Sequence, residues 1–336
     1  MTHSKKTADG HERHKGFSRG SYHMLKTLGF SLGLALLALL LYGLWTPDIK
    51  LTELEKRYGT AKLQRIEVDG LTVHYKDSGP KEAPALLLLH GFGSSLQTWD
   101  EWAMKLDPTY RVIRLDLPGF GLTGASPLRD YSEEKDVAIL THFADQLGLN
   151  KFSVIGHSMG GKMAWSLAAS QADRVQALVL MAPDGFPEAK DIGSKPYEVP
   201  AVMGLIKYCL PKYFVQKSIE PAFADAEALN QVLLNRYYDM LRAPGVRGAI
   251  LDRSNQTVYT DPVPRLRKIK APTLLLWGEL DQMIPKSNAQ SYAGVLLNST
   301  TVIVPKLGHL LQEEQPEKGL TALLQFLDAQ QLSIKP

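Results

Sequence analysis

One short segment of the sequence could supply a reactive serine. Ser158 stands between Gly156 and Gly160 in GHSMG, after the apolar run 152–155 and before a helix-forming stretch at 162–169. A sharp turn from strand to helix lifts a serine hydroxyl above the sheet, and glycines on either side leave room for that strained turn. The positive end of the following helix also lies near the hydroxyl. We therefore predict that Ser158 is a nucleophile.

A serine hydroxyl is a poor nucleophile unless a base removes its proton, and a histidine held by an acid commonly does so. For a serine on this kind of turn the chain order is serine, acid, histidine. The histidines outside the N-terminal tail are His74, His90, His142, His157 and His309. Only His309 lies far enough beyond Ser158 to return from a later strand, and it follows the apolar run 301–304. We predict that His309 is the general base.

Two acidic residues could orient His309. Glu279 and Asp281 both follow the apolar run 273–277, and Gly278 turns the chain away from that predicted strand. A few residues are then needed for the chain to reach back toward the histidine. We therefore predict Asp281 as the acid, with Glu279 as the alternative.

The attack of a serine on a carbonyl also requires donors for the oxyanion that develops, and one donor contributes roughly 3–4 kcal/mol. The glycine-rich segment HGFG, residues 90–93, follows the apolar run 85–89 and can aim the Phe92 N–H at the site. The Met159 N–H, next to Ser158, would be the second donor. We expect His90 to brace this loop rather than to transfer protons.

The elements that would position these residues alternate between short apolar runs and longer segments of helical period, such as 133–147. The predicted strands are 71–75, 85–89, 111–115, 152–155, 177–181, 273–277 and 301–304. Most are continuous apolar runs, which are typical of strands buried on both faces. We predict an α/β fold in which a mostly parallel central sheet is flanked by helices.

One region interrupts this alternation. Residues 185–262 contain no convincing buried strand, but they contain helical segments at 202–208, 212–219 and 226–241. We predict a helical cap inserted into a core formed by 65–184 and 263–331. Loops at the carboxyl ends of parallel strands carry ligand sites, so the cap is expected to form part of a substrate pocket.

The N-terminal part has the pattern of a membrane anchor. Residues 27–45 carry no charge, and that length of helix covers roughly 28 Å, close to the thickness of a bilayer core. We predict a disordered basic tail at 1–23, a single transmembrane signal-anchor at 24–46 and a linker at 47–64. The basic tail favours a cytoplasmic N-terminus and a globular part on the extracytoplasmic, periplasmic side. A cleaved signal peptide and a buried core helix are the alternatives.

Composition excludes several other classes of protein. The chain of 336 residues is 44% hydrophobic and 22% charged, which is typical of a globular protein. Its net charge is +3, but residues 1–26 alone carry +4, so the remainder has no basic surface excess to suit a nucleic acid. Cys209 is the single cysteine, so the chain has no internal disulfide and no cysteine-rich metal site.

Five segments together resemble the ordered motifs of the α/β-hydrolase superfamily, over about residues 65–331. They are HGFG at 90–93, DLPGFG at 116–121, GHSMGG at 156–161, WGELDQMIP at 277–285 and LGHLLQEEQP at 307–316. Within the superfamily the chain is similar to membrane-anchored monoacylglycerol lipases and bacterial esterases and lipases. One departure is Leu122-Thr123, where relatives often have a small residue and then serine.

The resemblance implies the α/β-hydrolase fold and a triad of Ser158, Asp281 and His309, with Phe92 and Met159 as oxyanion donors. It also implies hydrolysis of carboxylic esters without a cofactor. The cap and the anchor favour an apolar acyl ester, such as a monoacylglycerol or a short-chain ester. Relatives that hydrolyse carbon–carbon bonds of ring-cleavage products, or that act as haloperoxidases, keep the same serine. A non-catalytic ligand-binding protein at the membrane is a further alternative.

Overall fold

In the computed structural model, eight strands form one sheet in the order β1-β2-β4-β3-β5-β6-β7-β8. The strands are β1 (Leu63–Val68), β2 (Leu71–Ser78), β3 (Ala85–Leu89), β4 (Arg111–Leu115), β5 (Phe152–His157), β6 (Val175–Met181), β7 (Thr273–Gly278) and β8 (Ser299–Val304). β2 pairs antiparallel with β1 and β4, and the other strand pairs are parallel. The predicted mostly parallel sheet is confirmed.

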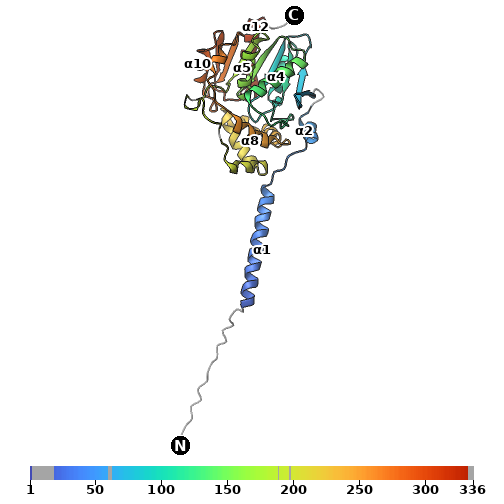
Figure 1. Ribbon diagram of the computed structural model, residues 1–336, viewed down its shortest axis with the longest axis vertical. Helices are drawn as coiled ribbons and strands as arrows, with labels where there is room; N and C mark the ends of the chain where they lie inside the picture. Colours follow the sequence, from blue (N-terminus) through green and yellow to red (C-terminus); the bar gives the residue numbers. More distant parts are fainter. Residues whose placement is uncertain (2–18, 60–62, 188, 197, 332–336) are drawn as a thin grey trace. The chain divides into compact units, whose positions relative to one another are not determined.

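The structure describes residues 1, 19–59, 63–187, 189–196 and 198–331 (Figure 1). The chain divides into two compact units, Met1–Trp45 and Thr46–Pro336. The sheet and the cap both belong to the second unit. β3 and β4 match the predicted runs at both ends, and the other five predicted strands extend one to three residues further.

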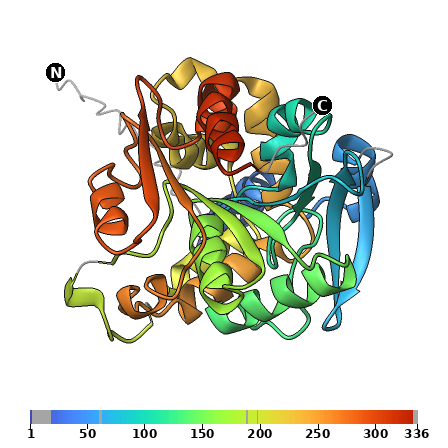
Figure 2. The same ribbon diagram turned by 90° about the horizontal axis from the view of Figure 1, so that it is seen from above.

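Helices cover both faces of the sheet (Figure 2). α4 (Glu133–Gln146), α5 (Met159–Ser170) and α10 (Asn288–Ala293) pack on one face, while α3 (Asp100–Leu106) and α12 (Pro316–Ala329) pack on the other. β3 illustrates the cause, because alternate side chains of a strand point to opposite faces. Leu87 and Leu89 enter the first core, and Leu86 and Leu88 enter the second. Such a strand needs apolar residues at every position.

The predicted linker 47–64 is instead part of the globular unit. It forms α2 (Leu51–Tyr58), and the fully buried Leu54 packs in one cluster with Met240 and Val246. β1 then begins at Leu63 and forms the edge of the sheet. α2 exposes a polar face and β1 is an edge strand with several exposed positions, so neither shows the continuous apolar run of a buried element.

The described residues of the predicted cap, 185–262, are helical and contain no strand. The helices are η2 (Ala189–Asp191), η3 (Ala201–Lys207), α6 (Lys212–Ile219), η4 (Glu220–Ala222), η5 (Ala226–Ala228), α7 (Gln231–Leu241) and α8 (Val246–Gln256). The predicted helix 226–241 is divided in two, because Asn230 caps α7 by accepting a hydrogen bond from the Leu233 N–H at 3.0 Å. Three short helices lie outside the cap: η1 (Leu96–Trp99), α9 (Val263–Leu266) and α11 (Leu311–Glu314).

The first unit contains the helix α1 (Arg19–Leu44), which begins before the predicted boundary at 24. Residues 19–23 are therefore helical rather than disordered, and 2–18 of the predicted tail lie outside the described residues. Among the residues that the structure describes, no helix is both long enough and apolar enough to cross a membrane. The predicted helix at 24–46 is thus found over most of its length, but its transmembrane assignment is not supported.

Candidate active site

Ser158 occupies a strained turn between β5 and α5. Its backbone angles are φ 54° and ψ −121°, a conformation that side-chain-bearing residues rarely adopt. The turn is held by the Ser158 N–H, which donates to Met181 O at 2.9 Å, and by the Ser158 carbonyl, which accepts from Lys162 N and Asp184 N. The strand-to-helix turn predicted from the sequence is therefore present.

The two flanking glycines are required by close backbone approach. A Cβ on Gly156 would lie 2.3 Å from the carbonyl oxygen of Gly160, and a Cβ on Gly160 would lie 2.4 Å from the carbonyl oxygen of His90. Real side chains do not fit at these distances. The spacing of the motif thus allows α5 to begin directly against the ends of β3 and β5.

His309 and Asp281 form a buried pair. His309 Nδ1 lies 2.8 Å from Asp281 Oδ2, and the Asp281 side chain is fully covered. The other carboxylate oxygen accepts from the N–H groups of Met283 and Ile284 at 2.8 and 2.9 Å. Glu279, the alternative acid, accepts from the Lys306 N–H instead. The structure therefore brings Asp281, rather than Glu279, to the histidine.

His157 joins the histidine loop to the serine turn. Its Nε2 donates to the His309 carbonyl at 3.0 Å, and the two imidazole rings are 4.5 Å apart. Burial, and secondarily the neighbouring His309, lower the pKa of His157 well below its usual range. This neutral histidine directly precedes Ser158, so its hydrogen bond holds the backbone of His309 next to the serine turn. This role of His157 was not predicted from the sequence, although the residue stands within the GHSMG motif.

Among the described residues, no hydrogen bond joins the Ser158 hydroxyl to His309. Such contacts are often long in free enzymes and shorten when a substrate binds. His309 Nδ1 is occupied by Asp281, and Nε2 has no partner within the described part of the chain. The unprotonated Nε2 is therefore the atom that can accept a proton.

The loop 90–93 lies against the serine turn. A Cβ on Gly91 would lie 3.2 Å from the Ser158 Cβ, so the loop passes close to the serine side chain. The amides of Phe92 and Met159 donate no hydrogen bond to any described residue. Both donors predicted for an oxyanion are therefore free.

His90 braces this loop, as expected from the sequence. Its Nδ1 lies 2.8 Å from the Gly91 carbonyl, and its Nε2 accepts from the Leu117 N–H at 3.0 Å. Burial lowers the pKa of His90 to about 4, so the ring is neutral at neutral pH. A neutral ring can accept at one nitrogen and donate at the other, as this bracing requires.

A pocket of about 760 Å³ opens at Ser158. Phe92, Met159 and Ile284 line it from the core, and residues 253, 254 and 256–261 line it from the cap. Its charged lining residues are Glu133, Glu134, Asp136, Lys162, Asp184, Arg253, Asp261 and Arg265. The pocket therefore combines apolar side chains with charged ones.

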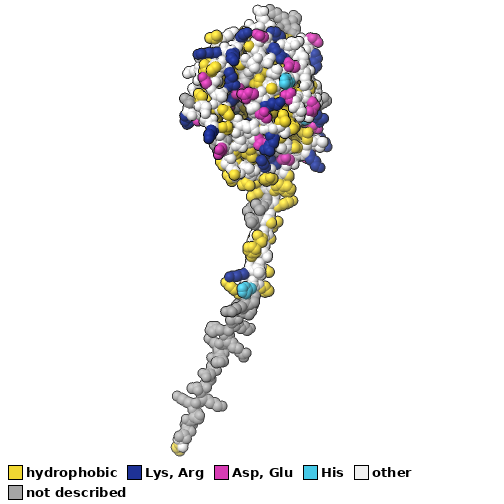
Figure 3. Space-filling model, in the orientation of Figure 1, with side chains coloured by type: hydrophobic (Ala, Val, Ile, Leu, Met, Phe, Trp, Pro, Cys, Tyr) yellow, Lys and Arg dark blue, Asp and Glu magenta, His cyan; other side chains and the backbone are white. Residues whose placement is uncertain are grey.

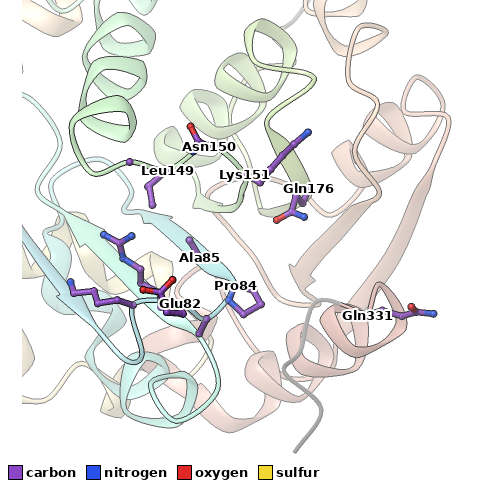
Figure 4. A pocket seen from close by; sticks show the side chains of 12 residues that line it. Glu82, Pro84, Ala85, Leu149, Asn150, Lys151, Gln176 and Gln331 are labelled. Carbon is purple, nitrogen blue, oxygen red and sulfur yellow. The ribbon is translucent and has the colours of Figure 1, made fainter.

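A second pocket of about 410 Å³ lies at the amino ends of the parallel strands, opposite the end that carries Ser158 (Figure 4). Ala85, Lys151 and Gln176 line it near the amino ends of β3, β5 and β6. It contains none of the predicted site residues. Among the described residues, no group of three or more His, Cys, Asp or Glu side chains is arranged to hold a metal ion.

The cap is seated on the loop that carries His309. The Ala222 carbonyl in η4 accepts from both His309 N and Leu310 N, at 2.7 and 3.1 Å. A Cβ on Gly308 would lie 2.6 Å from the same carbonyl oxygen. The buried Glu313 pairs with Arg236 of α7 at 2.5 Å and accepts from the Tyr237 hydroxyl at 3.0 Å. Glu313 belongs to the motif LGHLLQEEQP, but its contact with α7 was not predicted from the sequence.

Arg253 and Asp136 form a buried ion pair in the pocket wall. The guanidinium makes two hydrogen bonds to the carboxylate, at 2.6 and 3.1 Å, and donates to Pro118 O at 2.8 Å. It also lies 5.5 Å from the Phe120 ring and 5.0 Å from the Tyr131 ring. This pair attaches α8 to the core beneath the pocket.

Arg253→Met should destabilise the protein by about 3–5 kcal/mol, because it leaves the Asp136 carboxylate buried without its partner. Chemical denaturation monitored by tryptophan fluorescence measures this loss. The matched control is Arg129→Met, since Arg129 is 66% exposed in its pair with Asp252. The control should unfold at nearly the wild-type denaturant concentration, and equal losses in both variants would contradict the prediction.

Asp116 is a fully buried carboxyl group beneath the site. Its oxygens accept from Leu96 N and Leu122 N at 2.7 and 2.8 Å. A Cβ on Gly121 would lie 2.2 Å from the carboxyl carbon, so the DLPGFG turn is closed tightly around this side chain. Burial raises the pKa of Asp116 from 3.8 to about 7.

Asp116 should therefore make stability depend on pH. The native protein holds this proton more tightly than the unfolded chain, so the contribution is complete below the ordinary pKa and is lost as the pH rises through about 7. Between pH 3.8 and about 7, the free energy of unfolding of the wild type should fall, relative to Asp116→Asn, by up to about 1.4 kcal/mol per pH unit. Urea unfolding of both proteins over a pH series measures the difference. A constant difference would show that Asp116 does not titrate in this interval.

Comparisons with known proteins agree with this architecture. The family model of the alpha/beta hydrolase fold matches residues 84–316. A Bacillus subtilis protein provisionally named 2-succinyl-6-hydroxy-2,4-cyclohexadiene-1-carboxylate synthase is 31% identical, over 77% of this chain and 96% of its own length. A 2-hydroxy-6-oxononadienedioate/2-hydroxy-6-oxononatrienedioate hydrolase of Burkholderia vietnamiensis is 28% identical, over 82% of this chain and 98% of its own. The crystal structure of a membrane phospholipase A, 27% identical, covers 93% of this chain and 99% of its own with a TM-score of 0.68.

Proposed function

Because this chain belongs to the alpha/beta hydrolase fold family, we propose that it is a serine hydrolase that cleaves neutral carboxylic esters. The observation that carries the proposal is the site itself. Ser158 stands on a strained turn at the pocket, and the loop of the buried His309–Asp281 pair adjoins that turn through His157. Similar proteins include hydrolases of more than one bond type, so the ester preference rests on the pocket.

The first half of the reaction acylates the serine. His309 Nε2 takes the Ser158 proton while the hydroxyl oxygen attacks the ester carbonyl carbon. The tetrahedral oxyanion accepts hydrogen bonds from the N–H groups of Phe92 and Met159. His309 then gives its proton to the leaving alcohol oxygen as the carbon–oxygen bond breaks. The acyl group remains on Ser158.

The second half releases the acid. His309 removes a proton from a water molecule, which attacks the acyl carbon and forms a second tetrahedral intermediate. The intermediate collapses, the serine oxygen regains its proton from His309, and a carboxylic acid leaves. The Asp281 carboxylate stays ionised throughout and stabilises the positive charge of the imidazolium in both halves. No other reactant than water is needed.

The charges of the pocket favour a neutral ester over the dianionic or monoanionic products of ring cleavage. Of its eight charged lining residues, five are acidic and three are basic. All three cations are already paired: Lys162 and Arg265 with Glu133, and Arg253 with Asp136. A substrate carboxylate would meet no unpaired cation among the described lining residues. A neutral polar head with an acyl chain, as in a monoacylglycerol, suits both the polar wall and the apolar side chains of Phe92, Met159 and Ile284.

A substrate panel tests this proposal. We expect the full chain to hydrolyse monoacylglycerols and neutral acyl esters of a chain-length series, and Ser158→Ala to hydrolyse none of them. Ring-cleavage dienoates should be poor substrates. Turnover of the dienoates without turnover of esters would instead favour the carbon–carbon hydrolase; several similar proteins are named as hydrolases of 2-hydroxy-6-oxo-dienoates. Absence of labelling of the native chain by a fluorophosphonate would favour a non-catalytic binding protein.

For localisation, we propose that α1 attaches the protein to a membrane and that the hydrolase unit lies on the extracytoplasmic side. Support comes from the uncharged segment 27–45, from its exposed apolar side chains such as Leu28 and Phe30, and from the similar membrane phospholipase A. The protein should stay with the membrane fraction in high salt and be released by detergent. Protease added to intact spheroplasts should digest the hydrolase unit, whereas a protected unit would contradict the proposed side.

A further inference from the structure

The cap exposes a run of large apolar side chains on η3 and α6. They form what we call the cap apolar patch: Val202, Met203, Leu205, Tyr208, Tyr213 and Phe214. Between 46% and 66% of each residue is exposed. Single exposed apolar residues are ordinary, but a continuous group of them marks an interaction surface. Figure 3 shows hydrophobic side chains gathered at the end of the globular unit that carries the cap.

Local geometry presents these side chains together. η3 is a 3-10 helix, in which residues three apart share one face, so Val202 and Leu205 point the same way and Tyr208 follows in the same register. In α6 the rings of Tyr213 and Phe214 are 5.9 Å apart, while the next residue, Val215, is buried against the cap. The segment is thus anchored on one side and apolar on the other.

The chain segment that carries the patch is rich in lysine. Residues 199–219 include Lys207, Lys212 and Lys217 and no acidic residue, although Glu198 and Glu220 stand just outside this segment and Glu220 pairs with Lys217 at 2.7 Å. Aromatic and aliphatic side chains bordered by lysines are typical of surfaces that lie in the headgroup region of a bilayer. Lysine stems and tyrosine hydroxyls can reach the polar layer while the apolar parts are buried, and the positive charge is attracted to anionic lipids.

The chain connection also ends at this patch. Thr46 is the first residue of the globular unit and follows the apolar α1 directly. Its N–H donates to Tyr208 O at 2.8 Å, and its hydroxyl accepts from Leu210 N at 2.7 Å. Thr46, which stands two residues after the last residue of α1 in the sequence, is therefore held at Tyr208, within the cap apolar patch.

The patch is linked to the pocket as well. Val199, just before η3, donates its N–H to the Asn255 side chain at 2.9 Å, and Gly193 N donates to Tyr259 O at 2.9 Å. Residues 254 and 256–261 line the pocket. The loop that leads into the patch thus supports one wall of the pocket.

We propose that the cap apolar patch inserts into the interface of a lipid bilayer, as a membrane contact additional to α1, and delivers acyl substrates from the lipid to Ser158. This inference rests on the proposed ester hydrolysis and membrane attachment. Contact with lipid would place the pocket wall formed by residues 254 and 256–261 next to the bilayer in which an apolar ester is dissolved. An apolar ester would then reach the pocket without passing through water.

Lipid contact can be measured with a site-specific probe on the full chain. In a Cys209→Ser background, which removes the single thiol, Leu205→Cys carries an environment-sensitive nitrobenzoxadiazole label. Lys151→Cys, which directly precedes β5 at the amino ends of the parallel strands, is the matched control. In vesicles of phosphatidylcholine and phosphatidylglycerol, the label at 205 should shift to shorter wavelength and be quenched by lipids spin-labelled near the headgroup. The label at 151 should show neither effect.

Three results would overturn the proposal. Equal, weak quenching at 205 and 151 in protein that floats with the vesicles would show that α1 alone contacts lipid. Disulfide formation between copies of the unlabelled Leu205→Cys protein in air, together with no lipid quenching of the labelled protein, would assign the patch to a second copy of the chain. Failure of the protein to float with vesicles would refute both this contact and attachment through α1. None of these readouts depends on catalysis, so they are separate from the test of ester hydrolysis.

The functional consequence has its own test. Val202→Ser, Leu205→Ser and Phe214→Ser combined should lower hydrolysis of an ester embedded in vesicles by roughly tenfold or more, because each loses the gain from burying an apolar side chain. Hydrolysis of a water-soluble short-chain ester by the same variant should stay at the wild-type rate. Equal loss on both substrates, or loss on neither, would contradict delivery through the patch.

Discussion

Ser158→Ala should lower kcat for an acyl ester by at least about 10⁴-fold while leaving the fold intact. The variant has no hydroxyl to form the acyl-enzyme, and only the oxyanion donors and the pocket would remain to assist direct attack by water. Alanine is tolerated sterically, since it removes one atom from a side chain that lines the pocket. Steady-state hydrolysis and labelling by a fluorophosphonate measure the effect.

The matched control is Ser170→Ala in the last turn of the same helix. Ser170 donates only to Leu167 O, so its replacement removes a local hydrogen bond far along α5 from the pocket. Its kcat and labelling should stay close to wild type. If Ser158→Ala kept its labelling and activity, the nucleophile would have to be another residue.

Asp281→Asn should lower kcat by about 10⁴-fold with a small change in KM. The amide nitrogen would face either His309 Nδ1 or the N–H groups of Met283 and Ile284, all of which now donate to the carboxylate. The imidazole would lose both the acceptor that fixes its tautomer and the negative charge that stabilises its protonated form. Single-turnover kinetics with a chromogenic ester should place the loss in the acylation step.

Glu279→Gln is the control for this change. Glu279 stands two residues earlier on the same loop, but its carboxylate accepts from Lys306 N rather than from His309. An amide oxygen can accept that bond equally well, so kcat should be nearly unchanged. A large loss from Glu279→Gln with a small loss from Asp281→Asn would exchange the roles of the two acids.

The sequence predicted those parts of the structure whose local pattern is decided by burial on both sides. β3 is a continuous apolar run, and β4 contains Val112, Ile113 and Leu115 together with two arginines; the observed bounds of both strands equal the predicted ones. The carboxyl ends of parallel strands lie at the same end of the sheet. This rule and the chain order of serine, acid and histidine were enough to predict that Asp281 and His309 lie close together, and the structure places them in contact. Their catalytic roles, and those of Ser158, Phe92 and Met159, stay predictions for the experiments above.

The sequence could not predict features that depend on partners distant in the chain. β1 is a strand because it pairs with β2 at the edge of the sheet. α2 is ordered because Leu54 packs against residues of the cap. The pKa of Asp116 is raised because a turn closes around its side chain and buries it. The ion pair of Arg253 with Asp136 joins two elements that are more than 100 residues apart in the sequence. The polar lining of the pocket likewise comes from helix α4 and the cap meeting in space, which no local periodicity records.

The seating of the cap on the histidine loop limits how this protein could be re-engineered or could diverge. One carbonyl, Ala222 O, accepts hydrogen bonds from both His309 N and Leu310 N, and Glu313 of the following helix α11 binds α7. The cap is therefore not an interchangeable module. A cap grafted from a relative to change substrate range would have to bring the matching 308–313 segment with it, or His309, the proposed general base, would lose its alignment. Substrate range and catalytic competence are thus inherited together at this junction.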